Sequence, residues 1–419
     1  MNTDPNARKA AEAVDEARLW QRQMDMAAIG ALPNGGVNRA ALSPEDIRAR
    51  KLMIDWASEL GFEVSTDAIA NLYVRRAGRN ADAPPVATGS HLDSQPKGGK
   101  FDGAYGVVGG FEALEAIHRA GIETERPIDV IAWTNEEGGR YQPGVMGSSL
   151  YVGDDALEKM LPLVDTDGIK LADSLADTLA STPGLPTRTF GAPMSAYVEA
   201  HIEQGPRLEN ANNTIGVVSG IQGLFWFGVE VIGDEAHAGT TPLKGRKDAL
   251  KAAVSMVAAL EDLMADETDT VRFTVGRFEC HPGAPSTVPG RVYFTIDFRH
   301  PDPAVIARLT AGIAPTCEAN ARNCSVSVSP IIASAPVDFD PAVVDLVRAS
   351  ASELGLTHMD MPSGAGHDAG HIAGLCPTGM IFVPCEKGIS HNETESATPA
   401  DLAAGSRVLA ATLVKLANR

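Results

Sequence analysis

The amino-acid sequence predicts an α/β protein with a smaller α+β domain inserted into it. Over the first half of the chain, apolar strand signals alternate with helix signals, which is typical of an open α/β sheet. From residue 216 the pattern changes to alternating strands and long helices, and after residue 331 the first pattern returns. Because 419 residues are many for one domain, we expect a larger domain from residues 1–215 and 332–419 and an inserted domain from residues 216–331.

In the larger domain, we expect polar side chains at the ends of buried strands. Ser43 is a candidate helix N-cap, because acidic residues follow it in the first turn. An apolar strand leads directly to His91, and another precedes a pair of glutamates. The expected elements are helices at 44–60, 106–120, 341–354 and 399–417, strands at 84–88 and 127–134, and an irregular segment at 151–195.

The inserted domain is expected to be a four-stranded antiparallel sheet with two helices on one face. Apolar and polar residues alternate in its strand segments, as they do when one face of a sheet is buried. The expected elements are strands at 225–232, 271–278, 291–298 and 325–332 and helices at 247–264 and 303–321.

Composition restricts the partners of the chain. The net charge of −19 and the pI of about 4.9 argue against nucleic acid or an anionic membrane surface as a partner. No segment has the apolar core of a signal peptide or the length of a membrane span. The five cysteines lack Cys-x-x-Cys spacing, which favours a reduced, cytoplasmic protein.

Two short segments carry most of the information about chemistry. A glycine-rich segment contains His91, Asp93 and Asp102, and an apolar strand is followed by Glu136 and Glu137. Divalent cations take carboxylate and imidazole ligands, and a bridging carboxylate lets two cations lie close together. Two such ions can activate a water and polarise a carbonyl at the same time. The sequence therefore predicts a two-metal hydrolase.

Further candidate ligands are His201, Glu203 and His391. His367 and His371 have the spacing of a helical metal site, but the glycines around them argue against a helix, so we do not favour them as a metal pair. A histidine in a strand can also be an ordinary core residue, and adjacent glutamates can form a solvated turn. The absence of His-Glu-x-x-His, Gly-x-Ser-x-Gly and P-loop motifs disfavours a zincin, a serine hydrolase and a nucleotide-dependent enzyme.

The chain resembles the hydantoinase/carbamoylase branch of the M20 metallopeptidase-like amidohydrolases. This branch includes N-carbamoyl-L-amino acid hydrolases, β-ureidopropionases and allantoate amidohydrolases. Besides the segments above, residues 33–39, 366–369 and 389–393 carry the resemblance. It implies a two-zinc α/β catalytic domain with a smaller lid domain that also dimerises.

The resemblance implies a role for each candidate ligand. Asp102 would bridge the two ions, His91 and His201 would complete one metal site, and Glu137 and His391 would complete the other.

Two further residues would act beside the ligands. By the same resemblance, Glu136 would be the general base. Neighbours on an extended segment point to opposite sides, so Glu136 can face the substrate while Glu137 faces the metal. Asp93 would bond to the far nitrogen of His91 and fix its tautomer.

For substrate binding, the resemblance implies contacts from Gln204, His237, Ser286, Arg299 and Gly366. His237 would stabilise the oxyanion from the partner subunit, and Arg299 could hold a carboxylate with two parallel hydrogen bonds. Ser286 stands where the family usually has asparagine, and its hydroxyl lacks the paired donor and acceptor of an amide.

We therefore expect a homodimeric amidohydrolase that uses two divalent ions, zinc or else manganese, cobalt or nickel. The favoured substrates are small anionic N-carbamoyl amino acids, which would yield ammonia, carbon dioxide and the amino acid. The alternatives are an allantoate-type amidohydrolase, a dipeptidase or N-acyl amino acid deacylase, and a catalytically silent binding protein on the same scaffold.

Overall fold

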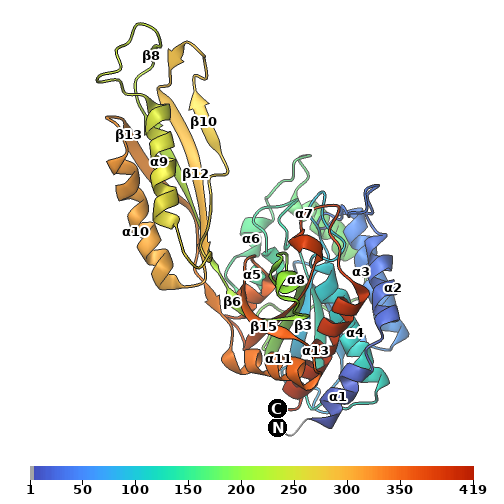
Figure 1. The fold of residues 1–419 in the computed structure, drawn as a ribbon. Coiled ribbons are helices and arrows are strands. Elements are labelled where there is room, and N and C mark those ends of the chain that lie inside the picture. Colours follow the sequence, from blue (N-terminus) through green and yellow to red (C-terminus); the bar gives the residue numbers. More distant parts are fainter. Residues whose placement is uncertain (1–3) are drawn as a thin grey trace. The chain divides into compact units, whose positions relative to one another are not determined.

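A computed structural model describes residues 4–419, which form two compact units (Figure 1). The larger unit consists of residues up to Gly220 together with Asp338–Arg419, and the smaller unit is Ile221–Val337. The expected boundary after residue 215 falls inside strand β6 (Ile215–Ile221), which pairs with β16 (Thr378–Val383) in the larger sheet. Each unit is described below by itself.

The larger unit is built on a nine-stranded mixed sheet with the order β1-β2-β4-β3-β5-β16-β6-β14, and β15 pairs with β6. Its central pairs, β4 with β3, β3 with β5 and β5 with β16, are parallel, and every residue of these four strands is buried. Besides β6 and β16, whose bounds are given above, the strands of this sheet are β1 (Glu63–Thr66), β2 (Leu72–Arg76), β3 (Val86–His91), β4 (Ile128–Trp133), β5 (Ala196–Ile202), β14 (Val337–Asp338) and β15 (His358–Ser363).

Helices pack against this sheet, among them α4 (Ala104–Arg119), which contacts β3, β4 and β5. A Cβ on Gly106 would lie 2.4 Å from the carbonyl oxygen of Ala200 in β5, so glycine permits the contact. In α3, the Ser43 hydroxyl accepts a hydrogen bond from the N–H of Asp46, which confirms the predicted N-cap. The other helices are α1 (Pro5–Glu12), α2 (Glu16–Ala27), α3 (Pro44–Glu59), α5 (Met146–Val152), α6 (Leu157–Met160), α7 (Leu171–Ala180), α8 (Arg207–Ala211), α11 (Pro341–Glu353), α12 (Asp368–Ile372) and α13 (Pro399–Ala417), with the 3-10 turn η1 (Glu386–Gly388).

Two local predictions were wrong. The segment 151–195, expected to be irregular, contains α6 and α7, because Leu171 and Leu175 bury one face of α7 in a small apolar cluster with Met146. The glycines near His367 do not prevent the short helix α12, for which His367 is the N-cap residue.

The smaller unit is a five-stranded antiparallel sheet with the order β10-β12-β7-β13, and β9 also pairs with β12. Helices α9 (Ala249–Met264) and α10 (Pro303–Ala319) cover one face of it (Figure 1). The strand expected at 271–278 is two strands, β9 and β10, which accounts for the fifth strand. The strands are β7 (Gly223–Ile232), β9 (Arg272–Thr274), β10 (Phe278–His281), β12 (Arg291–His300) and β13 (Ser325–Ser334), and β8 (Ala236–His237) pairs with β11 (Thr287–Val288) as a separate ribbon.

Among residues 4–419, no helix combines the length and the apolar character that crossing a membrane requires. All five cysteines are free thiols.

Candidate active site

The predicted ligands gather at one edge of the larger sheet. His91 is the last residue of β3, Glu136 and Glu137 follow the end of β4, and His201 lies near the end of β5. These three strands are parallel neighbours, so their carboxyl ends meet, as is usual for sites in α/β sheets.

Asp102 lies between two groups of candidate ligands. Its Oδ1 is 3.2 Å from His201 Nε2 and 3.9 Å from His91 Nε2. Its Oδ2 is 3.3 Å from His391 Nε2, which is itself 3.3 Å from Glu137 Oε2. Within each group the ligand atoms lie no more than 4.8 Å apart, close enough to hold one metal ion each. One carboxylate therefore faces both groups, with one oxygen toward each.

Glycine at position 103 permits this arrangement. Gly103 has a φ of 61°, which is left-handed, and a Cβ there would lie 2.2 Å from ring atoms of His91. His391 and Asn135 also have positive φ, at 52° and 55°, so both loops that deliver the ligands of the second group contain a left-handed residue.

Hydrogen bonds at the far ring nitrogens determine which nitrogens can bind a cation. The Nδ1 of His91 is 2.9 Å from the backbone carbonyl of Asp93, and the Nδ1 of His201 is 2.8 Å from that of Ile202. A carbonyl only accepts, so each Nδ1 carries a proton, and Nε2 is the nitrogen that each ring turns toward Asp102. When it carries no proton, the Nε2 of His201 can accept a hydrogen bond from the backbone N–H of Gly103 at 3.1 Å or bind a cation held by Asp102.

The charge balance also favours cations. Several buried or nearly buried carboxylates surround the site, and within residues 4–220 and 338–419 none forms an ion pair with lysine or arginine. Buried charges without a partner are costly. The carboxylates are those of Asp93, Asp102, Glu136, Glu137, Glu199, Asp368 and Glu395.

In the metal-free chain, protons bound by the histidines offset part of the negative charge of these carboxylates. Burial lowers the pKa of His201, but Asp102 outweighs it and raises that pKa to about 9. Hydrogen bonds that the His391 ring donates to Asp102 and Glu137 raise the pKa of His391 to about 10. Burial opposes ionisation of Asp102, yet His201 and His391 hold its pKa well below the usual range. The residues present thus fit divalent cations, which would replace these protons.

Glu136 faces the first ligand group. Its Oε2 is 3.3 Å from His91 Nε2, and its side chain is only 11% exposed. Burial, followed by the charges of Asp368 and Glu137, raises its pKa well above the ordinary range of a glutamate. A carboxylate in such surroundings binds a proton readily, as a general base must.

Asp93 acts differently from the expectation. Its carboxylate accepts hydrogen bonds from the backbone N–H groups of Glu136 and Glu137, both at 3.2 Å. Its Oδ1 is 3.9 Å from His91 Nδ1, and the backbone carbonyl of Asp93 makes the bond expected of the side chain. Asp93 therefore holds the glutamate pair by the backbone. Burial raises its pKa to about 6.

The predicted substrate contacts divide between the two units. Gln204 lies at the ligand site, where its Nε2 donates to Asp102 Oδ2 at 2.9 Å, and Gly366 precedes His367, whose ring lies 4.6 Å from that of His201. The other three contacts belong to the smaller unit. In its ribbon, β8 carries His237, and Ser286 accepts a backbone hydrogen bond from Ala238; Arg299 in β12 pairs with Asp297 at 3.1 Å.

The disfavoured pair of histidines does not form a site. His367 is buried with its Nε2 2.9 Å from the hydroxyl of Ser363, and His371 Nδ1 is 2.7 Å from a carboxylate oxygen of Asp154. Burial lowers the pKa of His367 well below the ordinary value, so this ring is neutral. Glu203, another candidate, accepts two backbone N–H groups at the start of α8, which is a structural role.

Sequence reasoning missed three residues that support the ligands. Gln95 donates to both the side chain and the backbone carbonyl of Glu137, at 2.9 and 3.1 Å. Ser390 and Glu395 contact Asp102 and its loop. Gln95 and Ser390 lie inside the motif segments and Glu395 lies two residues beyond Glu393, and that proximity in sequence was the signal available.

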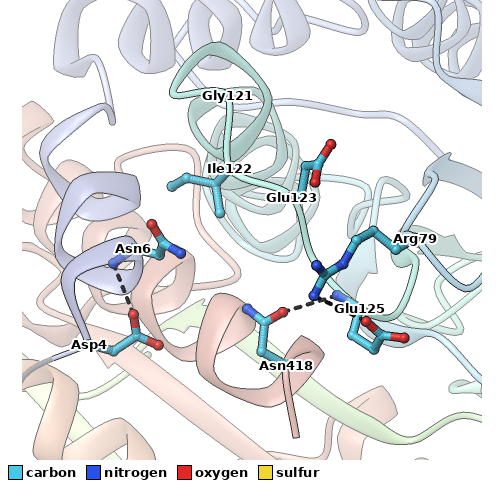
Figure 2. Close-up of a pocket in the computed structure, with 8 residues that line it drawn as sticks. All are labelled: Asp4, Asn6, Arg79, Gly121, Ile122, Glu123, Glu125 and Asn418. Carbon is cyan, nitrogen blue, oxygen red and sulfur yellow. Dashed lines mark hydrogen bonds and ion pairs between the residues drawn. The ribbon is translucent and has the colours of Figure 1, made fainter.

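The structure also has a cavity of about 620 Å³ away from these residues (Figure 2). Figure 2 shows it between the start of α1, the end of α13 and the connection from α4 to β4. That connection precedes β4, whereas Glu136 follows it, so the cavity and the ligand site lie at opposite ends of one strand. Its lining residues are Asp4, Asn6, Arg79, Gly121, Ile122, Glu123, Glu125 and Asn418, none of them a candidate ligand.

Fold and site together define an α/β enzyme in which groups of carboxylates and histidines could hold metal ions. The chain belongs to peptidase family M20/M25/M40, whose sequence model matches residues 87–415, and it is a hydrolase.

Comparison with individual proteins shows which members of the family the chain is similar to. The chain is 40% identical over 401 residues to an N-carbamoyl-L-amino-acid amidohydrolase of Rhizobium meliloti, covering 94% of this chain and 95% of the relative. It is 33% identical to a ureidoglycolate hydrolase of Arabidopsis thaliana, covering 96% and 87%. The crystal structure of an amidase of the hydantoinase/carbamoylase family from Burkholderia multivorans superposes with a TM-score of 0.91 at 45% identity, covering 97% and 98%.

Proposed function

We propose that this protein hydrolyses the ureido C–N bond of N-carbamoyl amino acids with two divalent metal ions. The observation that carries the proposal is the position of Asp102, whose two carboxylate oxygens face two separate ligand groups. The similarity to amidohydrolases named for N-carbamoyl-L-amino acids supports the choice of substrate.

The candidate ligands would form two metal sites that share Asp102. His91 and His201 would hold one ion, Glu137 and His391 the other, and Asp102 both. Bound there, the ions would supply Lewis acidity to the attacking water and to the ureido carbonyl.

Glu136 would move the proton. It would accept a proton from the attacking water and deliver it to the leaving nitrogen, which ordinary general acid–base chemistry requires. One N-carbamoyl amino acid and one water then give the amino acid, carbon dioxide and ammonia. Burial, which raises the pKa of Glu136, suits it to hold that proton between the two steps.

A second candidate is another ureido acid. Ser286 replaces the usual asparagine, and its single hydroxyl cannot pair with a substrate as an amide does. The similarity to a ureidoglycolate hydrolase points to the same alternative.

We further propose a homodimer in which His237 serves the partner's site. Strand β13 is an edge of the smaller sheet, ten residues long, largely exposed and without a charged side chain. Edges of this kind pair readily with a second copy. His237 is exposed on the ribbon of the same unit.

A substrate panel tests the proposed reaction. Metal-loaded protein is given N-carbamoyl amino acids, allantoate, ureidoglycolate, N-acetyl amino acids and dipeptides, and both ammonia and the released amino group are measured. The proposal predicts the highest kcat/KM for an N-carbamoyl amino acid. Preference for allantoate or ureidoglycolate would support the second candidate. Hydrolysis of only the acetyl compounds or dipeptides would contradict both, and turnover of none of them would favour a binding protein.

A further inference from the structure

One buried carboxylate, that of Glu395, joins the two loops that deliver Asp102 and His391. Its Oε1 accepts hydrogen bonds from the backbone N–H groups of Phe101 and Asp102, at 2.8 and 3.1 Å. Its Oε2 is 2.9 Å from the hydroxyl of Ser390, which precedes His391. Glu395 is 2% exposed, so these contacts lie out of water.

The same hydroxyl reaches the bridging carboxylate. Ser390 Oγ is 2.9 Å from Asp102 Oδ2, and Gln204 donates to both of these atoms, at 3.2 Å and 2.9 Å respectively. Glu395 thus acts on Asp102 by two routes, through the backbone that carries it and through Ser390. The orientation of Asp102 is the feature on which both ligand groups depend.

The neighbouring backbone leaves room for this carboxylate. A Cβ on Gly99 would lie 1.9 Å from the carboxyl carbon of Glu395, so only glycine fits there. Nearby Glu393, by contrast, has a single long contact at 3.3 Å, from the amide of Asn34, and it is partly exposed. Glu395 therefore contacts the loop that carries Asp102, whereas Glu393, two residues earlier, contacts Asn34.

We infer that Glu395 is a positioning residue that orients Asp102 and thereby sets the affinity of the centre for metal. The inference rests on the proposed function. Groups that orient metal ligands contribute roughly 10–100-fold to metal affinity. Glu395 belongs to neither of the two ligand groups, so its effect passes through Asp102 and Ser390.

Side-chain chemistry makes the inference specific. In Glu395→Gln, the amide oxygen can still accept from both backbone N–H groups, and the NH₂ can donate to Ser390, whose proton then turns to Asp102. In Glu395→Ala, the two N–H groups and the hydroxyl lose their partner. Glutamine fills the same space as glutamate, so Ser390→Ala, which removes only the hydroxyl between Glu395 and Asp102, separates the hydrogen-bond role from a role limited to filling space.

The test measures Zn²⁺ affinity of metal-free protein by competition with a chromophoric chelator, together with thermal unfolding of the metal-free form. We expect Glu395→Ala to bind zinc ~10–100-fold more weakly than wild type. Glu395→Gln should stay within a few fold, and the control Glu393→Ala should equal wild type. If Glu395→Ala does not fold, Ser390→Ala, which removes only the hydroxyl, should still weaken zinc binding.

Three results would overturn the inference. They are wild-type zinc affinity in Glu395→Ala, wild-type affinity in Ser390→Ala, and equal losses in Glu395→Gln and Glu395→Ala. In each of these three results wild-type protein still binds metal, so the proposed metal centre stands. Failure of wild-type protein to bind zinc, manganese, cobalt or nickel would instead overturn the proposed metal centre, and the inference with it.

Discussion

At the scale of single residues, the proposed function depends on which side-chain atoms face Asp102. Asp102 presents one oxygen to each ligand group, while His91 and His201 point their Nε2 atoms toward it because backbone carbonyls hold their other nitrogens. Asp93 holds the backbone of Glu136 and Glu137. One buried acid thus holds the backbone of both the proposed proton carrier, Glu136, and the proposed metal ligand, Glu137.

The variant Glu136→Gln removes the proposed proton carrier and leaves the proposed metal ligand Glu137 in place. The amide cannot accept a proton, so kcat should fall by roughly 10²–10⁴ while the fold and the metal content stay as in wild type. Steady-state kinetics with elemental analysis of the same sample measure both. A kcat within a few fold of wild type would mean that another group carries the proton.

The pH dependence of metal binding follows from the two histidines. With pKa values of about 9 and about 10 in the metal-free chain, His201 and His391 are protonated near neutral pH, and a metal must displace both protons. Apparent affinity should therefore rise with pH up to about 10, the higher of the two pKa values, and fall in acid. Calorimetry in buffers of different ionisation enthalpy measures the protons released. Release of none at neutral pH would show that these histidines are not ligands.

At the scale of elements, strand ends and left-handed residues bring the ligands together. Residue periodicity predicted the helix after Ser43, the buried strand before Glu136 and the final helix, because these signals are local. It missed α7 in a segment rich in polar residues, and it merged β9 with β10.

Contacts between distant residues could not be predicted in this way. Glu395 and Asp102 are 293 positions apart, and only the folded chain shows that they touch. The identity of the candidate ligands followed from the sequence motifs and the resemblance, whereas the way they are held did not. The bond from the backbone carbonyl of Asp93 to His91 is a second example, because a sequence shows side chains and not which carbonyl is near.

Two glycines of α4 give a matched test at this scale. Gly103 and Gly121 flank the helix with φ values of 61° and 63°, but only a Cβ on Gly103 would meet His91, and Gly121 has open space. Alanine at either position should cost about 1–2 kcal/mol in unfolding free energy, from left-handed backbone alone. Only Gly103→Ala should also lose metal affinity. Equal metal binding in the two variants would contradict the packing of His91 against Gly103.

At the scale of the whole molecule, the chain consists of a unit that carries the ligand site and a unit that carries His237, Ser286 and Arg299. In the proposed homodimer, His237 and Glu136 that serve one site come from different subunits. Mixing inactive Glu136→Gln with inactive His237→Ala protein should therefore restore activity, up to about a quarter of wild-type sites after random exchange. Absence of recovery after demonstrated subunit exchange would rule out action between subunits.

The most direct test of the central claim is metal stoichiometry measured together with hydrolysis. Chelator-treated protein is titrated with a divalent metal, and bound metal and ammonia release from an N-carbamoyl amino acid are followed on the same samples. The account predicts no turnover without metal and a rise in activity that ends at about two ions per chain. Full activity in protein that elemental analysis finds free of metal would contradict it.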